Sequence, residues 1–252
     1  MRSHVWQGIV FVNLSGNAAP FEEANGDLLA RWGEFEKPSY FGGADSAFDL
    51  EVKTNWKLAV ENYCESYHLP WVHPGLNSYS RLEDHYHIIE QGKFAGQGTL
   101  VYNPSLSEHQ AFANYDGLSQ KWDKSAEYIA LFPNVLLGVH RDHRFAIILR
   151  PDSLERTTER VAMFYADEKM CSDDYADLRA KNTALWKEVF EEDIFVVEGM
   201  QAGRHAPNFD GGKFSPVMDE PTWVFHHWVA SQMMKGQAAN DGGAPKQTVA
   251  AE

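Results

Sequence analysis

The sequence has few cysteines, a deficit of basic residues and no long apolar run, and each shortage argues against a class of protein. Its two cysteines, Cys64 and Cys171, lie far apart, which argues against a disulfide framework and excludes a cysteine-ligated zinc site or iron–sulfur cluster. The formal net charge of -14 argues against a nucleic-acid or anionic-membrane surface. No apolar run approaches the roughly 20 residues of a membrane-spanning helix, and the N-terminus lacks the apolar region of a signal peptide. We therefore expect a cytoplasmic protein with no nucleic-acid and no membrane partner.

The composition and the hydrophobic pattern indicate one α+β domain. Hydrophobic residues make up 44% of the 252 residues, which is typical of a globular protein. We expect strands at Val5–Leu14, Phe48–Lys53, His85–Gln91, Gly98–Tyr102, Tyr128–Leu131, Val135–His140, Phe145–Pro151 and Arg160–Ala166. We expect helices around Phe21–Phe35, from Thr54 or Asn55 onward, over residues 173–203 and over Pro221–Lys235. Short strands with hairpin-length connections form antiparallel sheets, so this sheet is expected to grip the long helix.

The segment NWKLAVENYCESYHLPWVHPGL contains the first candidate site residues. It places Glu65, His68 and His73 close together where Pro70 and Pro74 interrupt a helical pattern. The two histidines are five residues apart, about 140° around an ideal helix, so their rings converge only if the chain leaves the helix between them. Two imidazoles and a carboxylate suit a divalent transition metal, but the spacing alone is explained more often by two ordinary histidines near a helix end.

The helix in this segment is expected to present two faces. Its apolar face is formed by Trp56, Val60, Tyr63 and Tyr67, which recur at helical spacing. A second stripe is formed by Glu61, Glu65 and His68, which follow one another at i+4 and i+3. This pattern predicts a helix that continues as far as His68.

A further candidate ligand, Asp193, falls within the apolar stripe of the late helix. That stripe consists of Trp186, Val189, Phe190, Val197 and Met200, and the polar flanks hold Glu188, Glu191, Glu192 and Glu198. A carboxylate that faces a core costs several kcal/mol unless it is paired or binds a metal. A buried salt bridge with Arg or Lys is one explanation. The other is metal ligation together with His68 and His73, an arrangement that leaves coordination positions open on non-haem iron(II).

Two motifs together resemble a known family. ENYCESYHLPWVHPGL and, later, FEEDIFVVEGMQAGR, with a predicted sheet between them, resemble the catalytic domain of Rieske non-haem iron oxygenases, the α subunits of the ring-hydroxylating dioxygenase family. The likeness extends from VWQGIVFVNL through LFPNVLLGVH and ILRPDSLERT to FSPVMDEPTWVFHHW. The form ENYxExYHxxxxHP is more similar to members that act on quaternary ammonium compounds, of the choline, glycine betaine and carnitine types, than to naphthalene-type dioxygenases.

The resemblance implies a role for each candidate residue. It makes His68, His73 and Asp193 the ligands of a mononuclear Fe²⁺. It makes Glu65 the acidic residue that bridges toward a histidine of a [2Fe–2S] Rieske cluster in a neighbouring subunit of a homotrimer. A reductase or ferredoxin then supplies electrons, and O2 hydroxylates a quaternary ammonium or aromatic substrate. Further candidates, for each of which a structural role is the alternative, are Asn62, Gln201, His140, His143, His226 and His227.

The chain also departs from the family, because it has no paired Cys and His residues to hold a Rieske cluster. We expect a truncated α subunit, rather than a cluster carried by a separate polypeptide, and no activity without the cluster and a reductase. Residues 1–235 are expected to form a helix-grip (START-like) catalytic domain and residues 236–252 a disordered tail. Two other classes stay open: a metal-free ligand-binding module, and a zinc hydrolase with Glu65 as general base.

Overall fold

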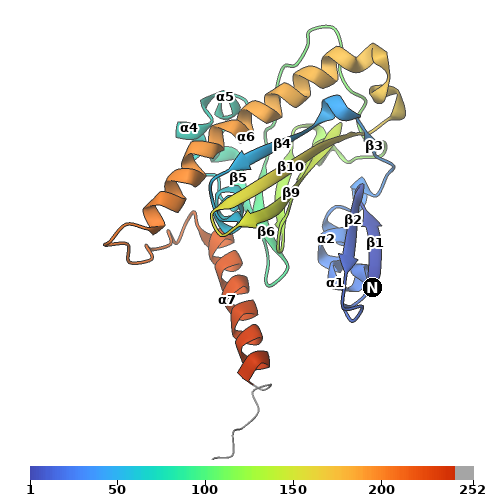
Figure 1. The fold of residues 1–252 in the computed structure, drawn as a ribbon. Helices are drawn as coiled ribbons and strands as arrows, with labels where there is room; N and C mark the ends of the chain where they lie inside the picture. Colours follow the sequence, from blue (N-terminus) through green and yellow to red (C-terminus); the bar gives the residue numbers. More distant parts are fainter. Residues whose placement is uncertain (242–252) are drawn as a thin grey trace, which may run out of the picture.

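An antiparallel sheet of eight strands forms the body of the molecule (Figure 1). The computed structural model describes the backbone of residues 1–241 and the side chains of residues 1–235. The strands are ordered β3-β10-β9-β8-β7-β6-β5, and β4 also pairs with β10. Their bounds are β3 Tyr40–Phe41, β4 Ala47–Val52, β5 His85–Glu90, β6 Phe94–Thr99, β7 Ala126–Leu131, β8 Val135–Val139, β9 His143–Ser153 and β10 Arg156–Tyr165. The predicted antiparallel sheet is therefore confirmed.

One strand of this sheet was misplaced by the sequence pattern. The strand expected at Gly98–Tyr102 is wrong, because β6 ends at Thr99 and Tyr102 lies in the following loop. Glycine weakens a strand unless a neighbouring strand needs the space, so the glycines of β6 argue against a strand at its actual position. Here the space is needed, since a Cβ atom on Gly96 would lie 2.1 Å from the carbonyl oxygen of Tyr128.

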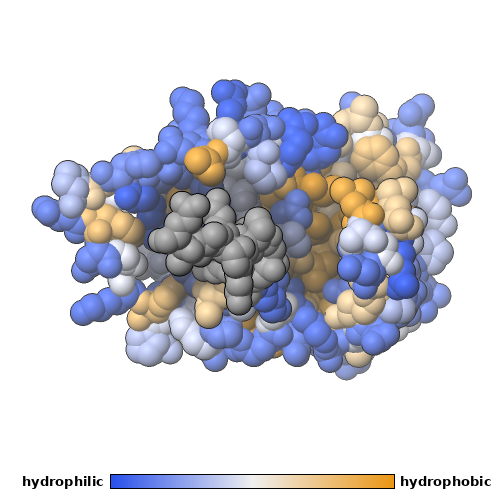
Figure 2. All heavy atoms as spheres, turned by 60° about the horizontal axis from the view of Figure 1, so that its bottom comes forward, coloured by the Kyte–Doolittle hydropathy of each residue, from blue (hydrophilic) through white to orange (hydrophobic). Residues whose placement is uncertain are grey.

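The N-terminal segment forms a separate hairpin. The single strand expected over Val5–Leu14 is wrong: β1 (Arg2–Trp6) and β2 (Ile9–Asn13) pair antiparallel. Gln7 and Gly8 make the turn with φ angles of 54° and 81°, the left-handed backbone that a two-residue hairpin turn requires. The hairpin stands beside the sheet, and Figure 2 shows apolar residues gathered in the hollow between the two.

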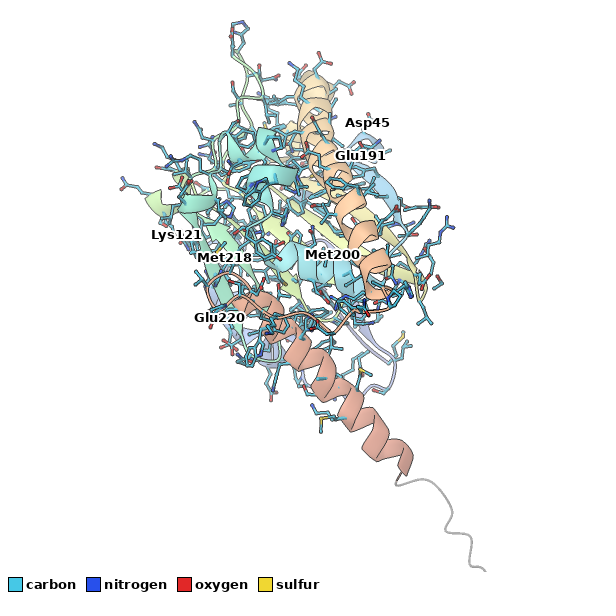
Figure 3. All side chains as sticks on the ribbon, turned by 90° about the vertical axis from the view of Figure 1, so that its left-hand side faces the viewer. Asp45, Lys121, Glu191, Met200, Met218 and Glu220 are labelled. Atoms are coloured by element: carbon cyan, nitrogen blue, oxygen red, sulfur yellow. The ribbon has the colours of Figure 1, made fainter. Side chains whose placement is uncertain are left out.

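Three longer helices cover one face of the sheet. They are α3 (Trp56–Cys64), α6 (Ala176–Arg204) and α7 (Glu220–Asp241). Helix α6 lies over the sheet beside β4, and α7 runs away from the body (Figures 1 and 3). The helix expected over Pro221–Lys235 thus continues to Asp241, and the rest of the expected tail, residues 242–252, lies outside the described residues. In the described part, no helix is long and apolar enough to cross a membrane.

Shorter helices fill the connections. The single helix expected over Phe21–Phe35 is wrong, because it is interrupted at Asn25 and Trp32, which take non-helical backbone angles. The short helices are α1 Phe21–Ala24, α2 Gly26–Arg31, η1 Gly33–Phe35, η2 Ala44–Ser46, α4 Leu69–Val72, α5 Pro74–Asn77, η3 Leu82–Asp84, η4 Gln120–Asp123, η5 Glu168–Cys171 and η6 Asp173–Tyr175.

The sheet separates two hydrophobic cores. Because side chains alternate along a strand, each strand contributes to both. On the helix side, Phe145, Val161 and Met163 pack with Trp186 of α6. On the other side lie the residues of the hairpin and of α2, among them Trp6, Ile9, Leu28 and Trp32, with Ile129 and Leu137 of the sheet. The helix-side core leaves the space in which the candidate site lies.

Candidate metal centre

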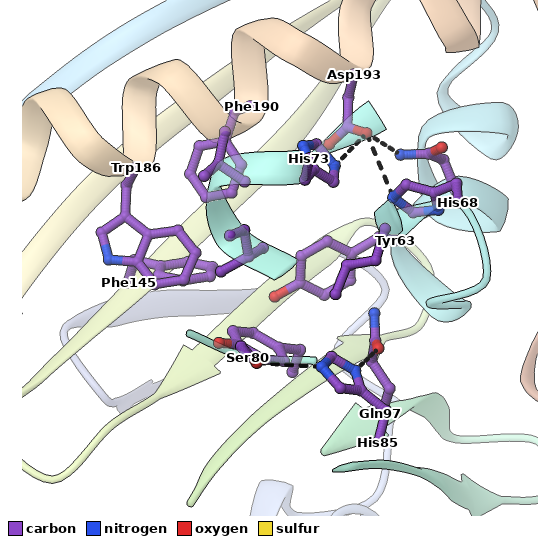
Figure 4. A pocket seen from close by; sticks show the side chains of 15 residues that line it. Tyr63, His68, His73, Ser80, His85, Gln97, Phe145, Trp186, Phe190 and Asp193 are labelled. Atoms are coloured by element: carbon purple, nitrogen blue, oxygen red, sulfur yellow. Dashed lines mark hydrogen bonds and ion pairs between the residues drawn. The ribbon is translucent and has the colours of Figure 1, made fainter. Parts of the chain in front are cut away.

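The structure brings His68, His73 and Asp193 together from two parts of the chain (Figure 4). His68 immediately precedes α4, His73 lies between α4 and α5, and Asp193 projects from the middle of α6. Each offers one ligand atom, and these atoms lie within 4.8 Å of one another. Pro70 and Pro74 occupy the first turns of α4 and α5, where proline needs no backbone N–H, so the chain bends between the two rings.

Two carboxylates fix the orientation of the histidine rings. The Nδ1 atom of His68 lies 2.5 Å from Oε1 of Glu65, and that of His73 lies 2.8 Å from Oε2 of Glu192. A carboxylate at Nδ1 holds the proton there and leaves the lone pair of Nε2 free for a metal. Both Nε2 atoms face Oδ1 of Asp193, at 3.6 Å for His68 and 3.0 Å for His73. The donor set therefore fits a divalent transition metal.

The surroundings of Asp193 differ from those of a buried salt bridge. In the part of the chain that the structure describes, its ion-pair partners are the two histidines, with no Arg or Lys. The side chain of Asn62 donates a hydrogen bond to Oδ1 at 2.8 Å. Burial alone would lower the pKa of His73, but hydrogen bonds and charges from Asp193 and Glu192 outweigh burial and raise that pKa. Metal binding at Nε2 of His73 therefore competes with protonation of this ring.

The local backbone around Glu65 corrects the expected helical stripe. Helix α3 ends at Cys64, and Glu65 takes an extended conformation with φ -116° and ψ 165°. The stripe is wrong because Glu61, still in the helix, pairs with Arg204 and His226 instead. Glu65 is buried, at 6% exposure, and reaches His68 from outside the helix.

A pocket with a mainly apolar wall opens beside the three ligands. Its volume is about 480 Å³, open mouth included, and its apolar wall is formed by Leu69, Leu76, Phe145, Trp186, Val189 and Phe190. Its polar edge is a hydrogen-bonded chain, in which His85 contacts Ser80 at 3.1 Å and Gln97 at 2.6 Å (Figure 4). Burial lowers the pKa of His85, which keeps the ring neutral.

Sequence reasoning missed these polar residues and placed Glu192 wrongly. Ser80, His85 and Gln97 come from a loop and two strands, and no motif connects them. Glu192 was expected on a polar flank of α6, but its carboxylate contacts His73. The sequence held a signal for this contact, because Glu192 directly precedes Asp193. Side chains at adjacent helix positions can both reach one buried group that lies between them.

The remaining candidates divide between the site and the scaffold. Asn62 joins the site through Asp193, whereas Gln201 accepts a hydrogen bond from the backbone N–H of Asn55 at the start of α3. His227 is exposed and stacks on Trp223. His226 pairs with Glu61, and both His140 and His143 are buried outside the pocket lining. None of these four histidines lies among the ligand group.

The fold and the donor set define a class of protein, namely an antiparallel α+β domain with a His₂–carboxylate site under its long helix. The family model described as "Ring hydroxylating alpha subunit (catalytic domain)" matches residues 32–235. The chain therefore belongs to this family.

Curated relatives and solved structures agree with this assignment. The carnitine monooxygenase oxygenase subunit of Escherichia coli (strain K12) is 24% identical over 215 residues, 84% of this chain and 54% of that protein. The putrescine 2-hydroxylase of Bordetella bronchiseptica is 26% identical over 216 residues, 79% of this chain and 49% of that protein. The quaternary ammonium Rieske monooxygenase CntA superposes with a TM-score of 0.69 at 20% identity, covering 91% of this chain and 60% of that chain. The chain thus spans about half the length of these curated relatives.

Proposed function

We propose that this domain binds one Fe²⁺ through Nε2 of His68, Nε2 of His73 and a carboxylate oxygen of Asp193. The observation that carries the proposal is the pair of Nδ1–carboxylate contacts, which direct both Nε2 lone pairs at Asp193. Bound iron would supply open coordination positions at which O2 is reduced and a C–H bond is hydroxylated. The protein side chains orient the ligands, hold their Nδ1 protons and exclude water with the apolar wall.

The substrate that we propose is a small quaternary ammonium compound or related amine, with an aromatic substrate as the second possibility. Curated relatives are named for carnitine, choline and putrescine, which are all amines. Aromatic rings of Tyr63, Tyr128, Phe145, Trp186 and Phe190 line the pocket, and each such ring face can attract a cation by about 0.5–2 kcal/mol. Hydroxylation of an N-methyl carbon would yield an N-hydroxymethyl product that releases formaldehyde.

We propose that electrons arrive through Glu65 from a [2Fe–2S] Rieske centre outside this sequence, itself reduced by a reductase or ferredoxin. Glu65 contacts His68 directly, and the neighbouring surface presents Tyr67 and Trp71 at 42% and 77% exposure. A solved structure of a quaternary ammonium Rieske monooxygenase is described as revealing inter-subunit electron transfer. A trimer, in which a neighbouring subunit supplies the Rieske centre, fits this placement of Glu65.

We also infer that residues 1–235 act as one helix-grip domain. The hairpin residues Trp6 and Ile9 share a core with the sheet, and α6 packs along the opposite face. A metal-free ligand-binding module has no need of the three converging ligands. A zinc hydrolase would use Glu65 as a base for bound water, but this carboxylate is already engaged with His68 Nδ1.

The test is turnover with and without a separate Rieske component. The iron-loaded chain is supplied with NADH, a reductase and a trimethylammonium substrate, and formaldehyde is measured. We expect turnover only when a Rieske component is added, and its loss in Glu65→Gln. The matched control is Glu191→Gln, an exposed helix carboxylate. Equal turnover with the reductase alone, or full activity in Glu65→Gln, would contradict the electron route.

A further inference from the structure

A second pocket lies beneath the start of α6, away from the metal ligands. It is larger than the metal pocket, about 900 Å³ with its mouth included. The loop after β6, the β8–β9 turn and Leu178 of α6 surround it. Trp186 lies between the two pockets. It lines the metal pocket, and its ring stacks on that of Tyr102, which lines the second pocket, with 5.9 Å between the ring centroids.

Two buried polar atoms belong to side chains that line this second pocket and have no hydrogen-bond partner among the described residues. They are the hydroxyl of Tyr102 and Nδ1 of His140, whose residues are 6% and 1% exposed. The two rings lie 4.6 Å apart. An unpaired buried polar atom costs about 1–3 kcal/mol, so two side by side indicate a binding partner for both.

The hydrogen bond between Tyr128 and His140 bears on which ring nitrogen of His140 carries the proton. The hydroxyl of Tyr128 lies 3.2 Å from Nε2 of His140. Burial raises the pKa of the Tyr128 hydroxyl well above its ordinary value, so it stays protonated and can donate to Nε2. Burial also lowers the pKa of His140 well below its ordinary value, so the ring is neutral. When Tyr128 donates to Nε2, the single proton of the ring lies on Nδ1.

The other polar groups nearby are already engaged or lie at the pocket rim. His143 stacks on His140 at 4.3 Å, contacts Asp142 through Nδ1 at 2.6 Å and accepts a hydrogen bond from the indole of Trp186 at 2.9 Å. Arg141 lines the same pocket and supplies a positive charge. Tyr102 keeps its proton as well, because burial raises the pKa of its hydroxyl. Asp123 and Asp142 line the pocket too, and Arg141 donates a hydrogen bond to the backbone carbonyl of Asp123. The pocket therefore holds two unpaired polar groups beside one cation and two carboxylates.

We propose that this pocket is a second ligand site, which takes a small molecule with a carboxylate or carbonyl oxygen held by the Tyr102 hydroxyl and the His140 Nδ1–H. An sp² oxygen has two lone pairs and can accept both hydrogen bonds at once. A carboxylate would be attracted by Arg141 and repelled by Asp123 and Asp142, whereas an amide carbonyl uses the two neutral donors alone. The site is separate from the metal ligands and does not depend on iron.

The test is a titration of the metal-free full chain, labelled with ¹⁵N-histidine, with sodium acetate, acetamide and methylammonium chloride. We expect a saturable shift of the His140 Nδ1 resonance with acetate or acetamide and none with methylammonium, which is only a donor. Binding of acetate alone would identify a carboxylate site, and equal binding of acetamide a carbonyl site.

Two variants test whether the resonance shift comes from binding at this pocket or from a general effect of the probes on the protein. Tyr102→Phe keeps the stacked ring and removes one donor, so the dissociation constant should rise about threefold to tenfold. Tyr79→Phe is the matched control, because Tyr79 packs edge-on against Tyr102 at 5.8 Å without lining the pocket. No saturable shift with either oxygen probe would overturn the proposal, and so would an unchanged dissociation constant in Tyr102→Phe.

Discussion

Glu159 offers a test of how burial beneath α6 changes the pKa of a carboxyl group. It lies on β10, paired with Leu50 of β4 and Leu149 of β9, and is only 9% exposed. It alternates in phase with Val161 and Met163 of the helix-side core, so its carboxyl group points toward the helices. Burial, with a smaller contribution from the charge of Asp193, raises the pKa of Glu159 from 4.5 to about 8.

This shift makes stability depend on pH with a definite sign. The folded chain binds a proton more tightly than the unfolded chain, so the stabilisation is complete below pH 4.5 and is lost as pH rises to about 8. Each unit of pKa corresponds to about 1.4 kcal/mol, which gives an upper limit of about 5 kcal/mol. Glu159→Gln keeps the shape of the side chain and cannot ionise, so its free energy of unfolding should not fall with pH for this reason.

Urea unfolding of the metal-free protein measures the effect. Free energies of unfolding of the wild type and of Glu159→Gln are compared at about pH 5 and about pH 9. We expect the variant to gain up to about 4 kcal/mol relative to wild type over this interval, because part of the limit is already lost at pH 5. Other titrating groups cancel between the two proteins. Two parallel pH profiles would refute the assignment of a buried, neutral Glu159.

Three more predictions follow from named contacts. Glu127→Ala should lower the free energy of unfolding by about 3–5 kcal/mol in a urea titration. The substitution removes a fully buried carboxylate that accepts hydrogen bonds from arginine, lysine, tryptophan and tyrosine side chains. The control Asp49→Ala, which breaks a surface ion pair, should cost less than about 1 kcal/mol. Glu192→Gln should weaken metal binding about tenfold to a hundredfold by calorimetry, with Glu191→Gln unchanged. In the metal-free chain, the stability contributed by His73 should be complete below pH 6.5 and lost as pH rises through its raised pKa, a loss that His73→Gln should not show.

The candidate metal ligands could be predicted from sequence because local chemistry marks them. Proline interrupts the helix between His68 and His73, and Asp193 stands on an apolar stripe where a carboxylate is costly. The structure brings these three residues together, as expected. The antiparallel sheet and the long helix were also predictable, since short strands with hairpin-length connections favour such a sheet and Trp186, Val189, Phe190 and Val197 recur at helical spacing.

The features of the site that could not be predicted from sequence depend on contacts between distant segments of the chain. The pairing of Glu192 with His73 and the chain from Ser80 through His85 to Gln97 require the register of β5, β6 and α6, which no local pattern determines. The position of β6 was missed for the same reason, because its glycines are explained only by the neighbouring strand.

Metal analysis of the anaerobically purified chain asks whether His68, His73 and Asp193 hold iron. We expect about one iron per chain, retained in Glu191→Gln and lost in His68→Ala and Asp193→Ala, which remove ligands. Stoichiometric zinc, or no metal after anaerobic reconstitution with Fe²⁺, would contradict it.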